Sequence, residues 1–203
     1  MKNSNKKAFI IIFNRYFFYF LLIVLVLCLL YIYIDSKGLI EEDSVLYKIG
    51  RLFNVEPANT LEVTQQIFIL TNNERMSRGL PALKLDENLS LIAYEHSRDM
   101  YFRGFFSHEN PEGEDPTDRA RKKGLSTING IWEGIGENIG ETPIGDVIGC
   151  GYVSSEESIA KCAVDSWMNS PGHRANILNI NYDVIGIGTY CTTSKCLNTQ
   201  DFR

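Results

Sequence analysis

The strongest constraint on this sequence is an apolar run near its start. Residues 16–34 form a stretch of 19 positions without a charged side chain, and nearly all of them are large and apolar. A helix of about 20 apolar residues is long enough to cross a bilayer while satisfying its own backbone hydrogen bonds. The sequence therefore predicts one N-terminal transmembrane helix at 16–34, followed by a separately folded part.

The charges around this run predict its orientation. Basic residues precede it and acidic residues follow it, and the positive end of a span stays in the cytoplasm. We therefore expect a cytoplasmic N-terminus at 1–15, a linker at 35–58 and an extracellular domain at 59–203. A cleaved signal peptide is the alternative, although the run is long for one and no small-residue cleavage site follows it. Cys28 is interpreted as a residue of the helix, because the bulky Leu27 before it does not suit lipoprotein processing.

The part that follows the run is acidic. It holds all 25 acidic residues but only 16 of the 20 basic ones, which leaves a net charge of −9. A nucleic-acid-binding surface needs clustered positive charge. No nucleic-acid partner is therefore expected.

Four cysteines lie in this external part, at Cys150, Cys162, Cys191 and Cys196. An even number in an oxidising compartment indicates disulfides. Four cysteines allow three connectivities, and we favour Cys150–Cys162 and Cys191–Cys196 because both pairs close short loops. Free buried thiols are the alternative.

The hydrophobic periodicity predicts a mixed α+β domain. Its expected order is helix, helix, short helix, strand, helix, strand and strand. The helices are expected at 59–79, 86–104, 115–124 and 154–170, and the last two strands at 183–191 and 197–203. Residues 142–153 are interpreted as a surface insertion. Ser166 is placed on the buried face of the last helix.

Several side chains receive a structural interpretation. Asn59 and Glu62 match a capping box at the start of the first helix. Glu74 and Arg75 are interpreted as a charged pair on the helix surface. His96 falls on the buried stripe of the second helix, and we expect a core histidine with a hydrogen-bond partner.

A loop motif and a nonapeptide carry the candidate chemistry. Phe105–His108 places His108 after two aromatic residues expected to be buried, where the chain leaves a helix. The segment Ser170–Leu178 reads Ser-Pro-Gly-His-Arg-Ala-Asn-Ile-Leu. Proline ends a preceding helix and glycine permits a turn, so His173 is expected on a rigid corner.

Together with Gly136–Ile139 and Ile185–Gly188, these motifs resemble the prokaryotic branch of the CAP superfamily. This is the SCP-like extracellular domain of cysteine-rich secretory proteins, antigen 5 and pathogenesis-related 1 proteins. The resemblance covers about Leu61 to Arg203. It implies the α-β-α sandwich of that fold, with His108, Glu137 and His173 lining one cleft.

The same resemblance implies further roles for residues around that cleft. His108 and His173, with Glu137 as a further ligand, match the metal-binding positions of the family, and zinc is the metal such donors would take. The second glutamate of the fuller animal pattern is missing here. Structural support is expected from the following residues: Asn176, which should tie the loop backbone, Arg174, which should face solvent or an acid, and Asp118 and Arg119, which should pair with each other.

Three functions remain open at this point, and whether the chain is an enzyme is undecided. The first is a membrane-anchored surface module that binds a lipid or another cell-envelope component in its cleft. The second is a hydrolase, protease-like, that uses His108, Glu137 and His173 as catalytic residues with metal or water. A serine version would recruit Ser107 or Ser170, but the chain has no Gly-x-Ser-x-Gly elbow. The third is a structural or interaction module without a ligand.

Overall fold

The computed structural model of the chain describes residues 24–26, 29–30, 58–125 and 134–203. The chain divides into two units, Met1–Val55 and Glu56–Arg203. In the first unit the described residues are helical, but most of the predicted span at 16–34, Cys28, and almost all of the predicted linker at 35–58 lie outside the described residues. Within the described ranges, no helix combines the length and the apolar character needed to cross a bilayer.

The second unit is built on a four-stranded sheet with the strand order β1-β5-β6-β2. These strands are β1 (Lys84–Leu85), β2 (Gly136–Pro143), β5 (Val184–Cys191) and β6 (Lys195–Phe202). β1 runs parallel to β5, and the other neighbours are antiparallel. β2 therefore forms one edge of the sheet. A separate hairpin pairs β3 (Gly145–Val147) with β4 (Gly151–Val153).

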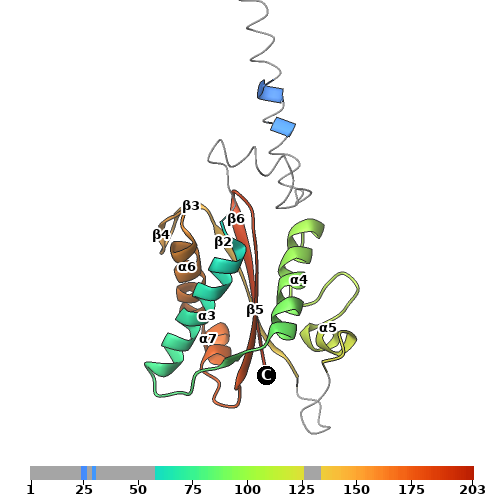
Figure 1. Cartoon of the computed structure of the whole chain (residues 1–203), viewed down its shortest axis with the longest axis vertical. Coiled ribbons are helices and arrows are strands. Elements are labelled where there is room, and N and C mark those ends of the chain that lie inside the picture. The colour runs from blue at the N-terminus through green and yellow to red at the C-terminus, as the bar shows by residue number, and fades with distance from the viewer. Residues whose placement is uncertain (1–23, 27–28, 31–57, 126–133) are drawn as a thin grey trace, which may run out of the picture. The chain divides into compact units, whose positions relative to one another are not determined.

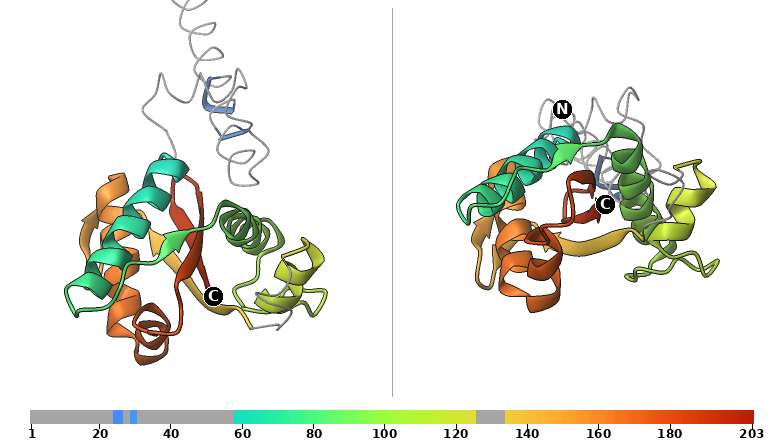
Figure 2. Two further views of the ribbon diagram at one scale, coloured as in Figure 1. Left: turned by 60° about the horizontal axis from the view of Figure 1, so that its bottom comes forward. Right: turned by 90° about the horizontal axis from the view of Figure 1, so that it is seen from below.

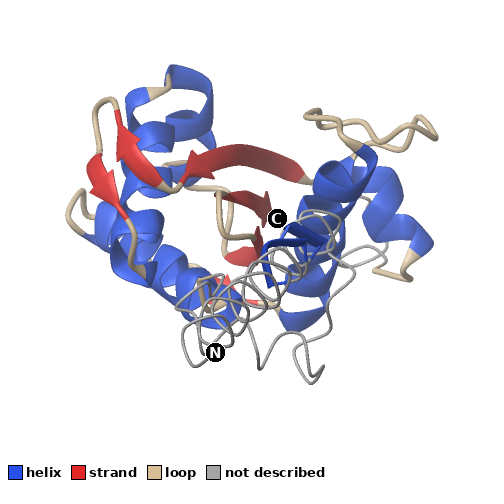
Figure 3. Ribbon diagram, turned by 90° about the horizontal axis from the view of Figure 1, so that it is seen from above, coloured by secondary structure: helices blue, strands red, loops and turns tan. Residues whose placement is uncertain are grey.

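Helices cover both faces of this sheet (Figures 1 and 2). One group comprises α3 (Thr60–Met76), α6 (Glu156–Asn169) and α7 (Pro171–Ile177), and the other comprises α4 (Glu87–Arg103) and α5 (Pro116–Lys122). Figure 3 shows the strands between the two groups. The predicted α+β sandwich is therefore confirmed for this unit.

Glycines in β5 explain how closely α4 lies on the sheet. A Cβ atom added at Gly188 would come within 1.8 Å of the Tyr94 backbone nitrogen, and one at Gly186 within 2.3 Å of the Leu89 carbonyl carbon. Only glycine permits such an approach of helix backbone to strand backbone. The alternate residues, Ile185 and Ile187, are buried in the core on the other face.

The apolar core lies mainly on the α3–α6–α7 face. Its large members include Val63, Ile67, Ile159, Trp167, Ile177 and Phe202. A smaller cluster of Met100, Ile139 and Leu197 lies under α4. Residues of β6 contribute to both clusters, because successive strand residues point to opposite faces of the sheet.

Several predicted helix ends and surface pairs need correction. Asn59 does cap α3 through its side chain, but its N–H donates to Glu156 of α6 (3.0 Å) and not to Glu62, so the capping box does not close. Arg75 is not on the surface. It is fully buried, and its guanidinium donates to four backbone carbonyls, those of Pro81, Ile177, Asn179 and Tyr182.

The fold also contains elements that the sequence pattern did not predict. These are β1, the β3–β4 hairpin within the expected insertion at 142–153, and α7, which begins at Pro171. Ser166 and Phe106 were expected to be buried and are exposed instead. Each lies beside an apolar residue that packs against the core, namely the buried Trp167 and the partly buried Phe105.

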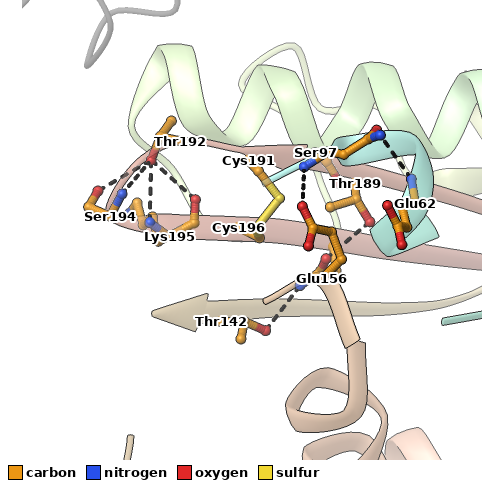
Figure 4. Close-up of a disulfide and its surroundings, with 12 residues drawn as sticks. Glu62, Ser97, Thr142, Glu156, Thr189, Cys191, Thr192, Ser194, Lys195 and Cys196 are labelled. Carbon is orange, nitrogen blue, oxygen red and sulfur yellow. Dashed lines mark hydrogen bonds between the residues drawn. A yellow bond between two sulfur atoms is a disulfide. The ribbon is translucent and has the colours of Figure 1, made fainter. Parts of the chain in front are cut away.

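Both predicted disulfides are present, Cys150–Cys162 and Cys191–Cys196. The second joins two directly paired residues of β5 and β6 and is buried. Figure 4 shows it beside the hairpin turn, where the Thr192 side chain bonds to Ser194 and to the Lys195 backbone. The bridge therefore closes a hairpin that its own turn already organises.

Candidate functional site

His108 lies in the loop that follows α4, and a buried carboxylate holds it in place. The helix ends at Gly104 in the left-handed conformation, which turns the chain away from the helix axis. The His108 Nδ1 atom lies 2.7 Å from Glu137 Oε1. The His108 side chain is 53% exposed, whereas that of Glu137 is 1% exposed. An exposed imidazole is thus anchored to a carboxylate inside the protein.

Arg119 of α5 supplies the countercharge for Glu137. Its Nη2 donates a hydrogen bond to Glu137 Oε2, and its Nη1 donates to the backbone carbonyls of His108 (2.7 Å) and Glu114 (3.1 Å). The expected Asp118–Arg119 pair is therefore wrong. Asp118 pairs with Arg121 instead (2.8 Å), because Arg119 faces the interior while Asp118 faces outward.

The bond to Glu137 fixes the chemical state of the His108 ring. A carboxylate accepts a hydrogen bond from the Nδ1–H group, so Nε2 is the nitrogen left for a ligand. The hydrogen bond to Glu137, opposed by burial, raises the pKa of His108 above its ordinary value. His108 is therefore protonated over a wider pH range than a free histidine.

His173 approaches the same place on α7. It lies in the first turn of this helix and is half-buried. Its carbonyl accepts a hydrogen bond from Asn138 Nδ2 (3.1 Å). Burial and the neighbouring His108 charge both lower the pKa of His173. The corner predicted here is thus helical, and Gly172 makes no contact that demands glycine.

Adjacent residues of the edge strand β2 link the two histidine segments. Glu137 and Asn138 point to opposite faces of the sheet, so one reaches the His108 ring and the other the His173 backbone. Asn176 secures this arrangement, since its Nδ2 donates to the Glu137 carbonyl (3.1 Å) and to Asn138 Oδ1 (2.9 Å).

The other expected support residues contribute less. Arg174 is exposed and donates to the Met168 carbonyl (3.2 Å). The Ser107 hydroxyl accepts from the Glu109 N–H (3.2 Å), which is a loop contact. Ser170 precedes α7 without forming a side-chain cap.

The residues do not fit the expected metal site. Both Glu137 oxygens are engaged, one by His108 and one by Arg119. Among the described residues, no three histidine, cysteine, aspartate or glutamate side chains are grouped so that they could hold a metal ion. A catalytic zinc site usually has three protein ligands, and this arrangement offers His108 and His173 alone.

Two further residues, His96 and Asp201, belong to the site, and the sequence did not identify either as a site residue. His96 is buried, as expected of a core histidine, and its Nε2 lies 3.0 Å from the Ser107 carbonyl oxygen. The same nitrogen is 3.9 Å from Glu137 Oε2. Burial lowers the pKa of His96, although Glu137 opposes this effect. Asp201 of β6 pairs directly with Glu137 in the sheet and is fully buried.

Asp201 lies in a polar run whose burial the sequence did not indicate. Residues 198–201 read Asn-Thr-Gln-Asp within a strand. A half-exposed strand would turn two of the four to solvent, yet all are buried. Strands covered on both faces usually read as apolar runs, so this polar run did not predict the burial of Asp201.

The sequence matches the family described as CAP, cysteine-rich secretory protein family, over residues 68–202. It is 36% identical to the protein YkwD of Bacillus subtilis (strain 168) over 146 residues, which is 72% of this chain and 49% of that protein. It is 32% identical to the membrane protein YlbC of the same strain over 124 residues, 61% of this chain and 30% of that protein. The chain thus spans at most about half the length of these curated relatives.

The fold is similar to a solved structure as well. An extracellular protein containing an SCP domain from Bacillus anthracis str. Ames superposes with a TM-score of 0.56 and 30% sequence identity. The match covers 70% of this chain and 40% of that protein. The motifs, the sandwich and these similarities agree, and the chain belongs to the CAP family of cysteine-rich secretory proteins.

Proposed function

We propose that the folded unit is a cell-surface module that binds an anionic group of a cell-envelope component through His108 and His173. This proposal rests on the contrast between His96 and His108, the two histidines that lie near Glu137. His96 is buried, as a histidine that only supports the fold would be. His108 is half exposed but is held by a buried carboxylate and a buried arginine.

A buried ion pair contributes little net stability, because desolvating both charges offsets their attraction. An orienting role for the Glu137–Arg119 pair explains its position better than a stabilising one. With a raised pKa, His108 offers a proton to a phosphate or carboxylate oxygen. With a lowered pKa, His173 stays neutral beside it and offers a second polar contact.

The cell-surface location rests on the N-terminal apolar run, its basic flank and the disulfides. A protein with a similar domain is extracellular and another is a membrane protein. We infer that the chain is a single-pass membrane protein with its N-terminus in the cytoplasm. A tag added after Arg203 should be labelled on intact cells, and labelling only after permeabilisation would contradict this topology.

The binding test follows the imidazole signals of the full-length protein in neutral detergent micelles. Inorganic phosphate is the first probe, and phosphatidylglycerol and purified cell-wall polymer are separate arms that distinguish a lipid from a wall source. A charge-assisted hydrogen bond contributes about 1.5–3 kcal/mol. His108→Ala should therefore weaken binding by about 10- to 100-fold.

Arg174→Ala is the matched control, since it removes a neighbouring exposed cation whose guanidinium donates to the Met168 carbonyl. Binding should weaken as the pH rises through the pKa of His108, because the neutral ring loses its ionic donor. Equal losses in the two variants, or no response to any of the three probes, would contradict the proposal.

A second function, hydrolysis, is favoured by one observation. The environments of His108 and His173 push their pKa values in opposite directions, which is the pattern of a general acid and a general base. His173 would then take a proton from water and His108 would protonate the leaving group. Turnover of an ester or peptide panel, with a bell-shaped pH profile and loss in both His108→Ala and His173→Ala, would favour this function over binding alone.

A further inference from the structure

Glu137 faces a second buried carboxylate across the sheet. Asp201 is its directly opposite partner in the β2–β6 register, so both side chains lie on the α4–α5 face. Asp201 is 0% exposed. Neither of its carboxylate oxygens has a hydrogen-bond donor as a partner among the described residues. A buried carboxylate without a donor is costly to keep ionised, so its charge state needs an explanation.

The groups around Asp201 include one buried cation for two buried carboxylates. Glu137 comes from β2, His96 from α4, Arg119 from α5 and His108 from the loop after α4. Arg119 is the fixed cation of this set, and it already bonds to Glu137. His96 is kept neutral by burial, which lowers its pKa. Two adjacent carboxylates that share one site do not both ionise.

We propose that Asp201 is a neutral carboxylic acid in the folded protein and donates its O–H to Glu137, which makes it a positioning residue for His108. This inference rests on the proposed function only in naming what the positioned imidazole is for. Glu137 then receives hydrogen bonds from Asp201, Arg119 and His108. The buried cluster carries one negative and one positive charge, and His108 is anchored to a carboxylate whose position is fixed from three sides.

The expected charge state agrees with the surroundings of Asp201. Burial first, and then the charge of Glu137 and the hydrogen bond to it, raise the pKa of Asp201 well above its ordinary value, while Arg119 lowers it less. A group with a raised folded pKa loses its contribution to stability as the pH rises from its unfolded value, about 3.9 for aspartate, through its folded value. The wild-type protein should therefore lose part of its stability across this window.

The direct test needs no substitution. The side-chain carboxyl carbon of Asp201 is followed by ¹³C NMR in the full-length protein, assigned through the signal that disappears in Asp201→Asn. At pH 7 the chemical shift should be that of a protonated acid. An ionised Asp201 at pH 7 would overturn the proposal, whether or not any ligand binds to His108.

A variant pair tests the positioning role. Asp201→Asn is neutral and keeps a donor for Glu137, so the melting temperature of the variant relative to wild type should increase as the pH rises from about 4 to 8, and the pKa of His108 should remain raised. Asp201→Ala removes the donor and should shift the His108 pKa. Asp165→Asn on the surface of α6 is the control and should do neither. A relative melting temperature of Asp201→Asn that falls with pH, or an unchanged His108 pKa in a folded Asp201→Ala, would overturn the positioning role.

Discussion

The two faces of the central sheet differ in the side chains that they bury. On the α3–α6–α7 face, apolar side chains such as Ile67 and Trp167 pack against the strands, and both disulfides lie on this side of the fold. On the α4–α5 face, glycines let α4 approach β5, and the end of the sheet buries Glu137, Arg119 and Asp201. The first face supplies most of the apolar packing that stabilises the fold, while the second positions the buried charged side chains.

The histidines show what this difference means for the site. His108 is held from the charged face by Glu137, and the His173 segment is held from the apolar face by Asn138. Both segments are attached to the edge strand β2, because Glu137 and Asn138 are neighbours in the strand and point to opposite faces. Changes on one face should therefore alter stability alone, and changes on the other should alter stability and the chemistry of His108 together.

The largest effect should come from the contact between α4 and β5. Gly188→Ala places a Cβ atom 1.8 Å from the Tyr94 backbone nitrogen, so the helix must move and take the His108 loop with it. We expect a loss above about 4 kcal/mol, which is exceptional for one substitution. Gly172→Ala is the matched control, with no atom within 4 Å of its new Cβ. Urea unfolding of both variants measures the difference, and a stable Gly188→Ala protein would refute the close packing.

Removing the buried Arg119 cation should reduce stability slightly less than this, but it should also change the pKa of His108. Arg119→Met leaves Glu137 without its partner, and breaking a buried pair costs about 3–5 kcal/mol. The pKa of His108 should shift as well, because the arginine acts on it electrostatically. Ile67→Val, on the apolar face, should cost about 0.5–1.5 kcal/mol and leave the His108 pKa unchanged. If the pKa of His108 shifted equally in both variants, the two faces would not differ in their effect on the site.

The disulfides should affect stability without affecting the site. Replacing Cys191 and Cys196 together by serine opens a short loop, as does replacing Cys150 and Cys162, and each change should cost about 2–3 kcal/mol on chain-entropy grounds. Thermal unfolding measures the loss, and NMR at a temperature where the variants stay folded should find His108 unchanged. A changed His108 chemical shift would show that the disulfides affect the structure of the site as well as stability.

The smallest effects should be opposite pH trends for the two histidines. The folded pKa of His108 is raised, so its contribution to stability is present below about pH 6.5 and is lost as the pH rises through the folded value. The folded pKa of His173 is lowered, so its trend has the opposite sign. Relative to wild type, His108→Asn should be less stable at pH 5 than at pH 8, by about 1 kcal/mol or less. His173→Asn should show the reverse in the same melting series, and parallel trends would contradict the assignment.

The sequence predicted the architecture well because its signals are local. The cap at Asp86, the stop at Gly104 and the Pro116 start of α5 each depend on the conformational preferences of a few residues. The Cys191–Cys196 bridge followed from a hairpin pattern. The family motifs then marked His108 and His173, which short-range patterns alone did not distinguish from other loop residues.

The charge partners could not be predicted because they are set by tertiary packing. Arg75 and Arg119 each stand in a helix beside an acidic residue, and local reasoning paired them with that neighbour. Both guanidinium groups instead point inward, one to backbone carbonyls and one to Glu137. The pairing of Asp201 with Glu137 depends on strand register between β2 and β6, which lie about 60 residues apart in the chain.

Titration of the imidazole signals by NMR in the full-length protein tests the central claim, that Glu137 holds and charges His108, most directly. The protein contains three histidines, which gives each signal a distinct expectation. His108 should titrate above the ordinary value of about 6.5, and His96 and His173 below it. Glu137→Gln should return His108 toward the ordinary value. A His108 pKa at or below 6.5 in the wild-type protein would contradict the account.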